Sequence, residues 1–210
     1  MRTDREMFRR CFVEKSWKFI RNNLDGFVLD IGSFDGLLVS AHKETIGIDI
    51  IANKSYIPFV LADMHHLPFK AEIFDTVLMS HVLEHTDKPS IVLKEAKRVL
   101  KIDGKLIVSM PNAKAPIGKL LKFSIGHDGY AFPRKSEKME HKIFLGFDEL
   151  KYLIEKCGFT IQSSFGSTPH LPMVERIFDL RFLRKLYWKL GDINKKYSKD
   201  LIFISKKLHF

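Results

Sequence analysis

Cysteine is scarce in this chain of 210 residues, which contains only Cys11 and Cys157. Two isolated thiols are too few for a disulfide framework or a cysteine-based zinc site. The histidines and acids do not fall at metal-ligand spacing on one recognisable element, so we expect no metal site. The sequence also lacks an apolar run near twenty residues and an apolar stretch within residues 1–6. We therefore expect a protein of the cytoplasm without a membrane-spanning helix.

Acidic residues are fewer than basic ones, 25 Asp and Glu against 35 Lys and Arg, and the formal net charge is +10. This balance indicates attraction to anions such as nucleic acid, an acidic lipid surface or an anionic substrate. An equally weighted interpretation is a generally basic surface without a specific partner, because Lys and Glu are mixed along most of the chain. The length is that of one domain with a substantial core, and we assign residues 1–210 to it.

The Gly-x-Gly-x-x-Gly fingerprint of nicotinamide cofactor sites is missing. The chain has Asp30-Ile31-Gly32-Ser33-Phe34-Asp35-Gly36, with Phe34 where a pyrophosphate needs a bare backbone. Residues 28–31 are typical of a buried strand, followed by a glycine turn that opens a helix. Residues 46–50 are typical of a second strand, and its Asp49 can accept hydrogen bonds from both hydroxyls of a ribose. The pattern predicts a site for an adenosine-containing cofactor without phosphates, which S-adenosylmethionine fits.

Five segments rich in Val, Ile, Leu or Phe lack polar alternation, which is typical of strands buried on both faces of a parallel sheet. They lie near residues 27–32, 45–50, 57–62, 74–80 and 104–110. Helical periodicity covers about 88–101, where Asp87 is the expected N-cap, and about 147–157, where Gly158 is the expected C′ residue. Only eight residues separate Asp49 from Pro58, so we expect a loop there instead of a crossover helix.

Several motifs follow one another in the order of a known enzyme family. They are the glycine turn with Asp49, Val60 to Met64 with Leu67-Pro68-Phe69, Phe74 to His85, Glu95 to Leu106, and His141 with residues 147–159. Together they resemble the class I S-adenosylmethionine-dependent methyltransferases, in the small-molecule subgroup (type 11) that includes quinone-biosynthesis enzymes. The resemblance covers roughly residues 24–165 and a last strand near 201–206. It implies a Rossmann-like α/β fold, with a mostly parallel seven-stranded sheet, an antiparallel last hairpin and flanking helices.

The resemblance also implies a set of cofactor-binding residues: Asp30, Gly32, Ser33, Phe34, Gly36, Asp49, Ile50, Asp63, Met64, Ser80 and His81. Asp30 would lie near the ammonium group of the methionine moiety, with the backbone N–H groups around Gly32 near its carboxylate. Asp49 would bind the ribose. Asp63 would accept from the adenine amino group, and Met64 would line the ring. S-adenosylhomocysteine would be the product.

Two histidines are candidates for a general base. His81 lies at the tip of the expected fourth strand, and the ordinary pKa of a histidine suits proton transfer near neutral pH. His141 matches a family position that lines the acceptor pocket. Many methyltransferases act mainly by proximity and need no base. His85 is expected to order the turn before the next helix, and His65 and His66 are expected on a loop surface.

Extra chain occurs at about residues 112–140 and 167–200, and we expect these two insertions to form a substrate lid. Both are basic with interleaved aromatics, and the second contains Arg181, Arg184 and Lys185. The leading hypothesis is O-, N- or C-methylation of a small molecule, which the charge suggests is anionic. RNA methylation is the second hypothesis, and a cofactor-binding relative without turnover is the third. The oligomeric state does not follow from the sequence.

Overall fold

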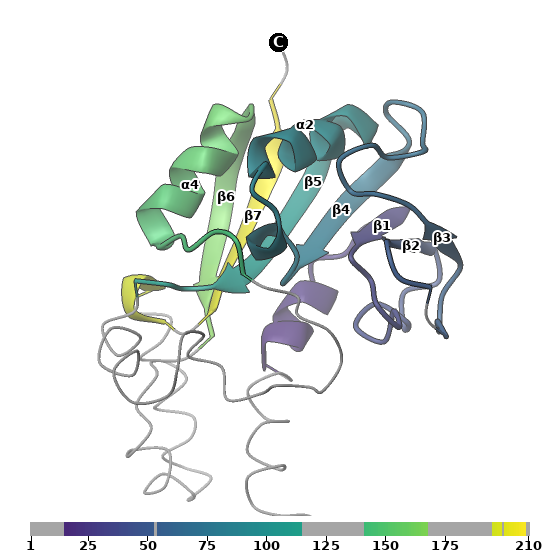
Figure 1. Ribbon diagram of the computed structural model, residues 1–210, viewed down its shortest axis with the longest axis horizontal. Coiled ribbons are helices and arrows are strands. Elements are labelled where there is room, and N and C mark those ends of the chain that lie inside the picture. Colours follow the sequence, from purple (N-terminus) through teal and green to yellow (C-terminus); the bar gives the residue numbers. More distant parts are fainter. Residues whose placement is uncertain (1–14, 53, 115–140, 168–194, 199, 209–210) are drawn as a thin grey trace, which may run out of the picture.

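The computed structural model describes residues 15–52, 54–114, 141–167, 195–198 and 200–208. They form a seven-stranded sheet in the order β3-β2-β1-β4-β5-β7-β6 (Figure 1). The strands are β1 (Val28–Ile31), β2 (Thr45–Asp49), β3 (Phe59–Leu61), β4 (Phe74–Ser80), β5 (Leu100–Pro111), β6 (Phe159–Gly166) and β7 (Asp200–Lys207). Neighbours among β1 to β5 are parallel, whereas β7 is antiparallel to both β5 and β6. The mostly parallel sheet with an antiparallel last hairpin is thus confirmed.

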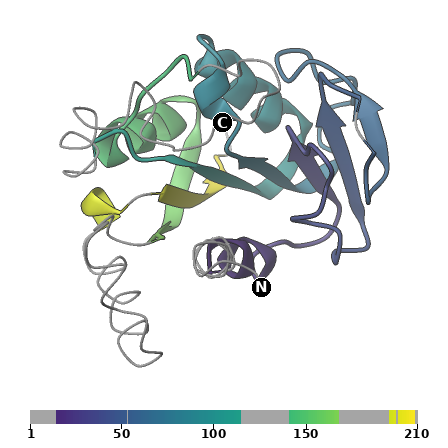
Figure 2. The same ribbon diagram turned by 60° about the horizontal axis from the view of Figure 1, so that its bottom comes forward.

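Helices cover both faces of the sheet. Figures 1 and 2 show α2 (Pro89–Val99) and α4 (Phe147–Lys156) on one face, and the helical residues 15–21 on the other. Two short 3₁₀ helices, η1 (Leu83–His85) and η2 (Lys195–Tyr197), follow β4 and precede β7. Across the ranges that the structure describes, no helix is both long enough and apolar enough to cross a membrane.

The central strands bury side chains in two separate layers. Leu201 and Phe203 of β7 pack in the layer that contains the apolar faces of α2 and α4. Ile202 and Ile204 alternate with them and pack in the layer that contains Ile20 of the opposite helix. This two-sided burial explains why the strand sequences are apolar without alternation.

The two expected helices are present, but α2 begins differently from the prediction. Its N-cap is Lys88, without a side-chain cap, so the prediction of Asp87 as N-cap is wrong. Pro89 is the first helical residue, a position that tolerates its missing N–H and matches its fixed φ. The N–H of Lys88 instead bonds Thr86 Oγ1 at 2.9 Å. At the end of α4, Gly158 has φ +87° directly after the C-cap, as expected for a C′ glycine.

The connection between β1 and β2 contains turns where the sequence predicts a helix. Gly36 has φ +72°, and its N–H bonds Ser33 O at 2.7 Å, while Val39 N bonds Gly36 O at 3.2 Å. Arg21 lies in the helix at residues 15–21, and its Nε donates to Leu38 O at a distance of 2.7 Å. These bonds satisfy the backbone without an α-helix, so the strand–helix–strand prediction is wrong in its helix. The described residues between β2 and β3 are also free of helix, as their small number predicts.

Candidate active site

The carboxyl ends of the parallel strands carry most of the polar residues predicted for the site. Because the strand order is β3-β2-β1-β4, this edge of the sheet presents a row formed by Asp63 after β3, Asp49 in β2, Asp30 in β1 and Ser80 in β4, followed by His81. Open α/β sheets bind their ligands at this edge. The fold therefore brings together residues that are spread over 52 positions of the chain, from 30 to 81.

Asp30 is a buried acid with a raised pKa. It is 3% exposed. Burial, followed by the charges of Asp49 and Asp35, raises the pKa of Asp30 to about 8. Within the described ranges, no lysine, arginine or histidine forms an ion pair with it. A cationic group placed beside Asp30 would favour the charged carboxylate and lower this pKa.

Asp49 is held in a defined orientation at the end of β2. Its Oδ2 accepts from Phe34 N, and its Oδ1 accepts from Ile51 N, both at 3.1 Å. Each carboxylate oxygen has a second lone pair, so both can accept one more hydrogen bond. An oriented carboxylate with spare acceptor capacity is what two neighbouring ribose hydroxyls require.

The glycine turn after β1 is closely packed. A Cβ atom on Gly32, which has φ +69°, would lie 2.3 Å from Val82 Cγ2, and one on Gly47 would lie 2.4 Å from Ser33 Oγ. The N–H groups of Gly32 and Ser33 donate to Ile48 O at 2.8 and 3.0 Å. These two N–H groups are therefore engaged within the protein, and their contact with a cofactor carboxylate stays a prediction.

Two residues of the predicted site have left-handed backbone conformations that are uncommon outside glycine. Phe34 has φ +51° and His81 has φ +56°. Strained conformations of this kind collect at ligand-binding sites because the surrounding fold must hold them. Phe34 is also an exposed large apolar side chain, as are Ile50, Ile51 and Leu61 at the neighbouring ends of β2 and β3. Such exposed apolar groups offer a surface for a flat base.

Asp63 belongs to a chain of hydrogen bonds that the sequence does not indicate. Its Oδ1 accepts from His65 N at 2.9 Å and contacts His65 Nδ1 at 2.6 Å, while His65 Nε2 lies 2.8 Å from Thr86 Oγ1. The hydrogen bonds from His65 lower the pKa of Asp63. His65 lies on the loop after β3, partly exposed, and it also bridges the ends of β3 and η1, which the sequence does not indicate. Met64 packs partly buried against the core.

The tip of β4 gathers three histidines around one buried acid. His81 Nδ1 lies 3.4 Å from Glu84 Oε1. Glu84 is 1% exposed, and its Oε2 has no hydrogen-bond donor in the described part of the protein. His85 and His141 have ring centroids 5.0 Å apart. Both candidate bases, His81 and His141, are thus neighbours of this tip, and the sequence does not place Glu84 between them.

The two insertions enter and leave the sheet at neighbouring points, although their interiors lie outside the described residues. Pro111, at the end of β5, is paired with Asp200 of β7. Asn112 Nδ2 donates to Lys196 O at 2.9 Å and to Ser198 O at 2.8 Å. The first residue of the first insertion is therefore joined directly to residues near the end of the second.

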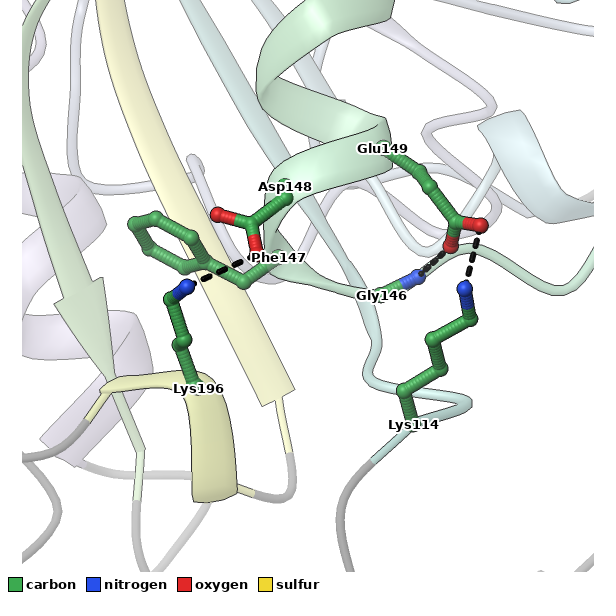
Figure 3. A pocket seen from close by; sticks show the side chains of 6 residues that line it. All are labelled: Lys114, Gly146, Phe147, Asp148, Glu149 and Lys196. Carbon is green, nitrogen blue, oxygen red and sulfur yellow. Dashed lines mark hydrogen bonds and ion pairs between the residues drawn. The ribbon is translucent and has the colours of Figure 1, made fainter.

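A cavity of about 210 Å³ lies at this shared base, beside the first turn of α4 (Figure 3). Lys114 is paired with Glu149, and Lys196 with Asp148 at 2.8 Å. Glu149 also accepts from Gly146 N at 2.8 Å, which caps the helix. These pairs neutralise the two lysines locally, so the cavity is not a simple anion site.

The donor set along the carboxyl edge fits S-adenosylmethionine. Among the residues placed in the structure, no basic side chain pairs with Asp30, and the ammonium group of the cofactor would supply that cation. Asp49 has acceptor capacity for the ribose, and exposed apolar side chains border it for the adenine.

Comparison with known sequences also indicates a methyltransferase. A family described as "methyltransferase domain" matches residues 29–108. Two uncharacterized proteins of Methanocaldococcus jannaschii are 32% identical over 62% of this chain and 63% of the relative, and 31% identical over 87% and 76%. The chain thus spans less than two thirds of the first of them. A demethylmenaquinone methyltransferase of Thermotoga maritima is 34% identical over 31% of this chain and 30% of that enzyme.

The fold has a counterpart among solved structures. An S-adenosylmethionine-dependent methyltransferase of Thermotoga maritima superimposes with a TM-score of 0.69 at 21% identity, covering 96% of this chain and 91% of that one. At this identity the likeness establishes the shared fold.

Proposed function

Because this chain belongs to the class I S-adenosylmethionine-dependent methyltransferases, enzymes that take their methyl group from S-adenosylmethionine, we propose that its acceptor is a small molecule. The observation that carries the assignment of the methyl donor is the row of Asp63, Asp49, Asp30 and His81 along one edge of the sheet. It offers polar contacts in the order base, ribose, amino acid and acceptor.

At the adenosine end, Asp63 accepts from the adenine amino group, and Met64 and Ile50 contact the ring. Asp49 accepts from the two ribose hydroxyls. Its existing bonds to Phe34 N and Ile51 N hold the carboxylate in place for this role. Preorientation reduces the conformational entropy that binding must remove.

At the methionine end, Asp30 pairs with the ammonium group. The turn formed by Gly32, Ser33, Phe34 and Gly36 closes over this part of the cofactor. Ser80 and His81 lie at the end of β4 next to Asp30 in the sheet order, so they face the point where donor and acceptor meet.

When bound, the cofactor supplies a methyl group activated by its sulfonium charge. Asp30, Asp49 and Asp63 would hold the cofactor, which would leave as S-adenosylhomocysteine once its methyl group had been transferred. The contribution of the chain is alignment of the two reactants. For a protonated acceptor, His81 or His141 takes the proton.

The acceptor region is proposed to come from the insertions, residues 112–140 and 167–200, acting together as a lid. Their roots are joined through Asn112, Lys196 and Ser198, which supports one shared pocket. The name of the Thermotoga maritima relative, a demethylmenaquinone methyltransferase, supports a small-molecule acceptor. The net charge of +10 favours an anionic one.

Transfer of labelled methyl groups into fractionated extracts of the source cells tests the proposal. We expect label in the small-molecule fraction, and much less of it with Asp49→Ala at a limiting concentration of the methyl donor. Label confined to RNA would replace the small-molecule acceptor by RNA. A variant with Arg181, Arg184 and Lys185 changed to Gln should keep its affinity for S-adenosylhomocysteine and lose transfer to an anionic acceptor. Normal transfer by that variant would contradict a role of this basic cluster.

A further inference from the structure

Three potential metal ligands meet beside the tip of β4. Glu84 and His85 belong to η1, and His141 begins the described segment that ends the first insertion. Their ligand atoms all lie within 4.8 Å of one another. Backbone hydrogen bonds hold the two segments together, because Lys142 N and Ile143 N donate to Glu84 O at 2.8 and 3.3 Å.

The buried acid at the centre of the cluster is incompletely satisfied. Glu84 is 1% exposed, and its Oε2 has no hydrogen-bond donor among the described residues. Its other oxygen lies 3.4 Å from His81 Nδ1. A buried carboxylate oxygen without a donor is costly, and a bound cation is one of the few groups that can compensate it.

We propose that Glu84, His85 and His141 bind a divalent transition-metal ion, for which Zn²⁺ is the best match. Two imidazoles and one carboxylate form a donor set that suits Zn²⁺, whereas Mg²⁺ and Ca²⁺ prefer oxygen ligands alone. His85 and His141 are partly exposed, which leaves a path for the ion.

The ion requires only a small contraction of the cluster. Zinc–ligand distances of about 2.0–2.2 Å place tetrahedral ligands about 3.3–3.5 Å apart. The ligand atoms, which lie within 4.8 Å of one another, reach this spacing by side-chain rotation. A metal-bound His141 cannot also take a proton, so His81 would then be the general base.

Metal binding by the full-length protein tests the site without methyl donor or acceptor. Zn²⁺ is titrated in competition with a chromophoric chelator, and Co²⁺ absorption reports the coordination. We expect one ion per chain, with affinity reduced at least tenfold by Glu84→Gln and by His141→Ala. His66→Ala is the matched control, because His66 is an exposed histidine outside the cluster, and it should bind as the wild type does.

Folding of each variant is checked by its affinity for S-adenosylhomocysteine in the presence of a chelator. If His141→Ala fails this check, His85→Gln replaces it. The proposal is overturned if the wild type binds no Zn²⁺ at micromolar concentration. It is equally overturned if folded Glu84→Gln and His141→Ala bind as tightly as wild type. In that case the cluster is a set of side-chain contacts without an ion.

Discussion

Arg98 forms a two-pronged ion pair with Glu95 one turn earlier in α2, with Nε–Oε1 and Nη2–Oε2 distances of 2.8 Å. The pair also holds the loop after β3. Arg98 donates to Phe69 O at 2.7 Å and to Leu67 O at 2.9 Å, while Leu67 N donates to Glu95 Oε2 at 2.9 Å. Two motifs that resemble the same enzyme family are thus bonded to each other.

Replacing Arg98 by Ala should lower the free energy of unfolding by about 1–3 kcal/mol, because two loop carbonyls and Glu95 lose their donor. Urea unfolding measures the change, with Lys94→Ala on the exposed side of α2 as control. Hydrogen bonding from Arg98 lowers the pKa of Glu95. The stabilisation that Glu95 contributes is therefore present above the ordinary pKa of a glutamate, and it is lost as the pH falls from there through the lowered pKa. Equal stability of the two variants near neutral pH would contradict this role.

Asp49→Ala should weaken binding of S-adenosylhomocysteine by about 1.5–3 kcal/mol, because the charge-assisted bonds to the ribose disappear. Calorimetry measures the affinity. Asp87→Ala removes an exposed acid away from the row and should bind normally. Wild-type affinity of Asp49→Ala would remove Asp49 from the site.

Asp30 makes the cofactor-free protein less stable as pH rises. Its pKa is raised from 3.8 to about 8 by burial, then by Asp49 and Asp35. Between these values the folded protein retains a proton that the unfolded chain has lost, so unfolding releases a proton and stability falls with increasing pH. Asp30→Asn lacks this effect, and its stability relative to wild type should increase from pH 5 to pH 8. A difference that does not change with pH would contradict the raised pKa.

The same acid predicts proton release when S-adenosylhomocysteine binds near pH 7. The ammonium group favours the charged carboxylate, so the pKa of Asp30 falls on binding. Calorimetry in two buffers of different ionisation enthalpy should show nearly one proton released by wild type and less by Asp30→Asn. No dependence on the buffer would place the ammonium group elsewhere.

NAD should not displace S-adenosylhomocysteine, because Phe34 occupies the turn position where a pyrophosphate needs a bare backbone. Competition calorimetry with about 1 mM NAD tests this. Micromolar competition by NAD would show that the turn accepts a dinucleotide.

Buried strands and the row of acids at their ends were predictable, because strand burial and strand-end position are local properties of the sequence. The turns between β1 and β2 were not, since one of their carbonyl groups, that of Leu38, is bonded by Arg21 from a distant segment. The start of α2 shows a competition between two local signals, in which Pro89 at the first helical position prevailed over Asp87 as a cap.

The cluster of Glu84, His85 and His141 depends on three-dimensional proximity alone, because residues 86–140 separate His141 from the other two in the sequence. The need for glycine at position 47 also depends on contacts between segments that are apart in the sequence. A Cβ there would meet Ser33 Oγ, a reason that only the packed turn reveals.

The junction of Asn112 with Lys196 and Ser198 has a consequence for how such enzymes diversify. The first insertion begins and the second ends at this junction, away from Asp49 and Asp63 at the other end of the strand order. A pair of insertions from a relative can therefore be exchanged as a cassette while the donor half stays unchanged. Chimeras cut at this junction would acquire a new acceptor preference with the original affinity for S-adenosylhomocysteine.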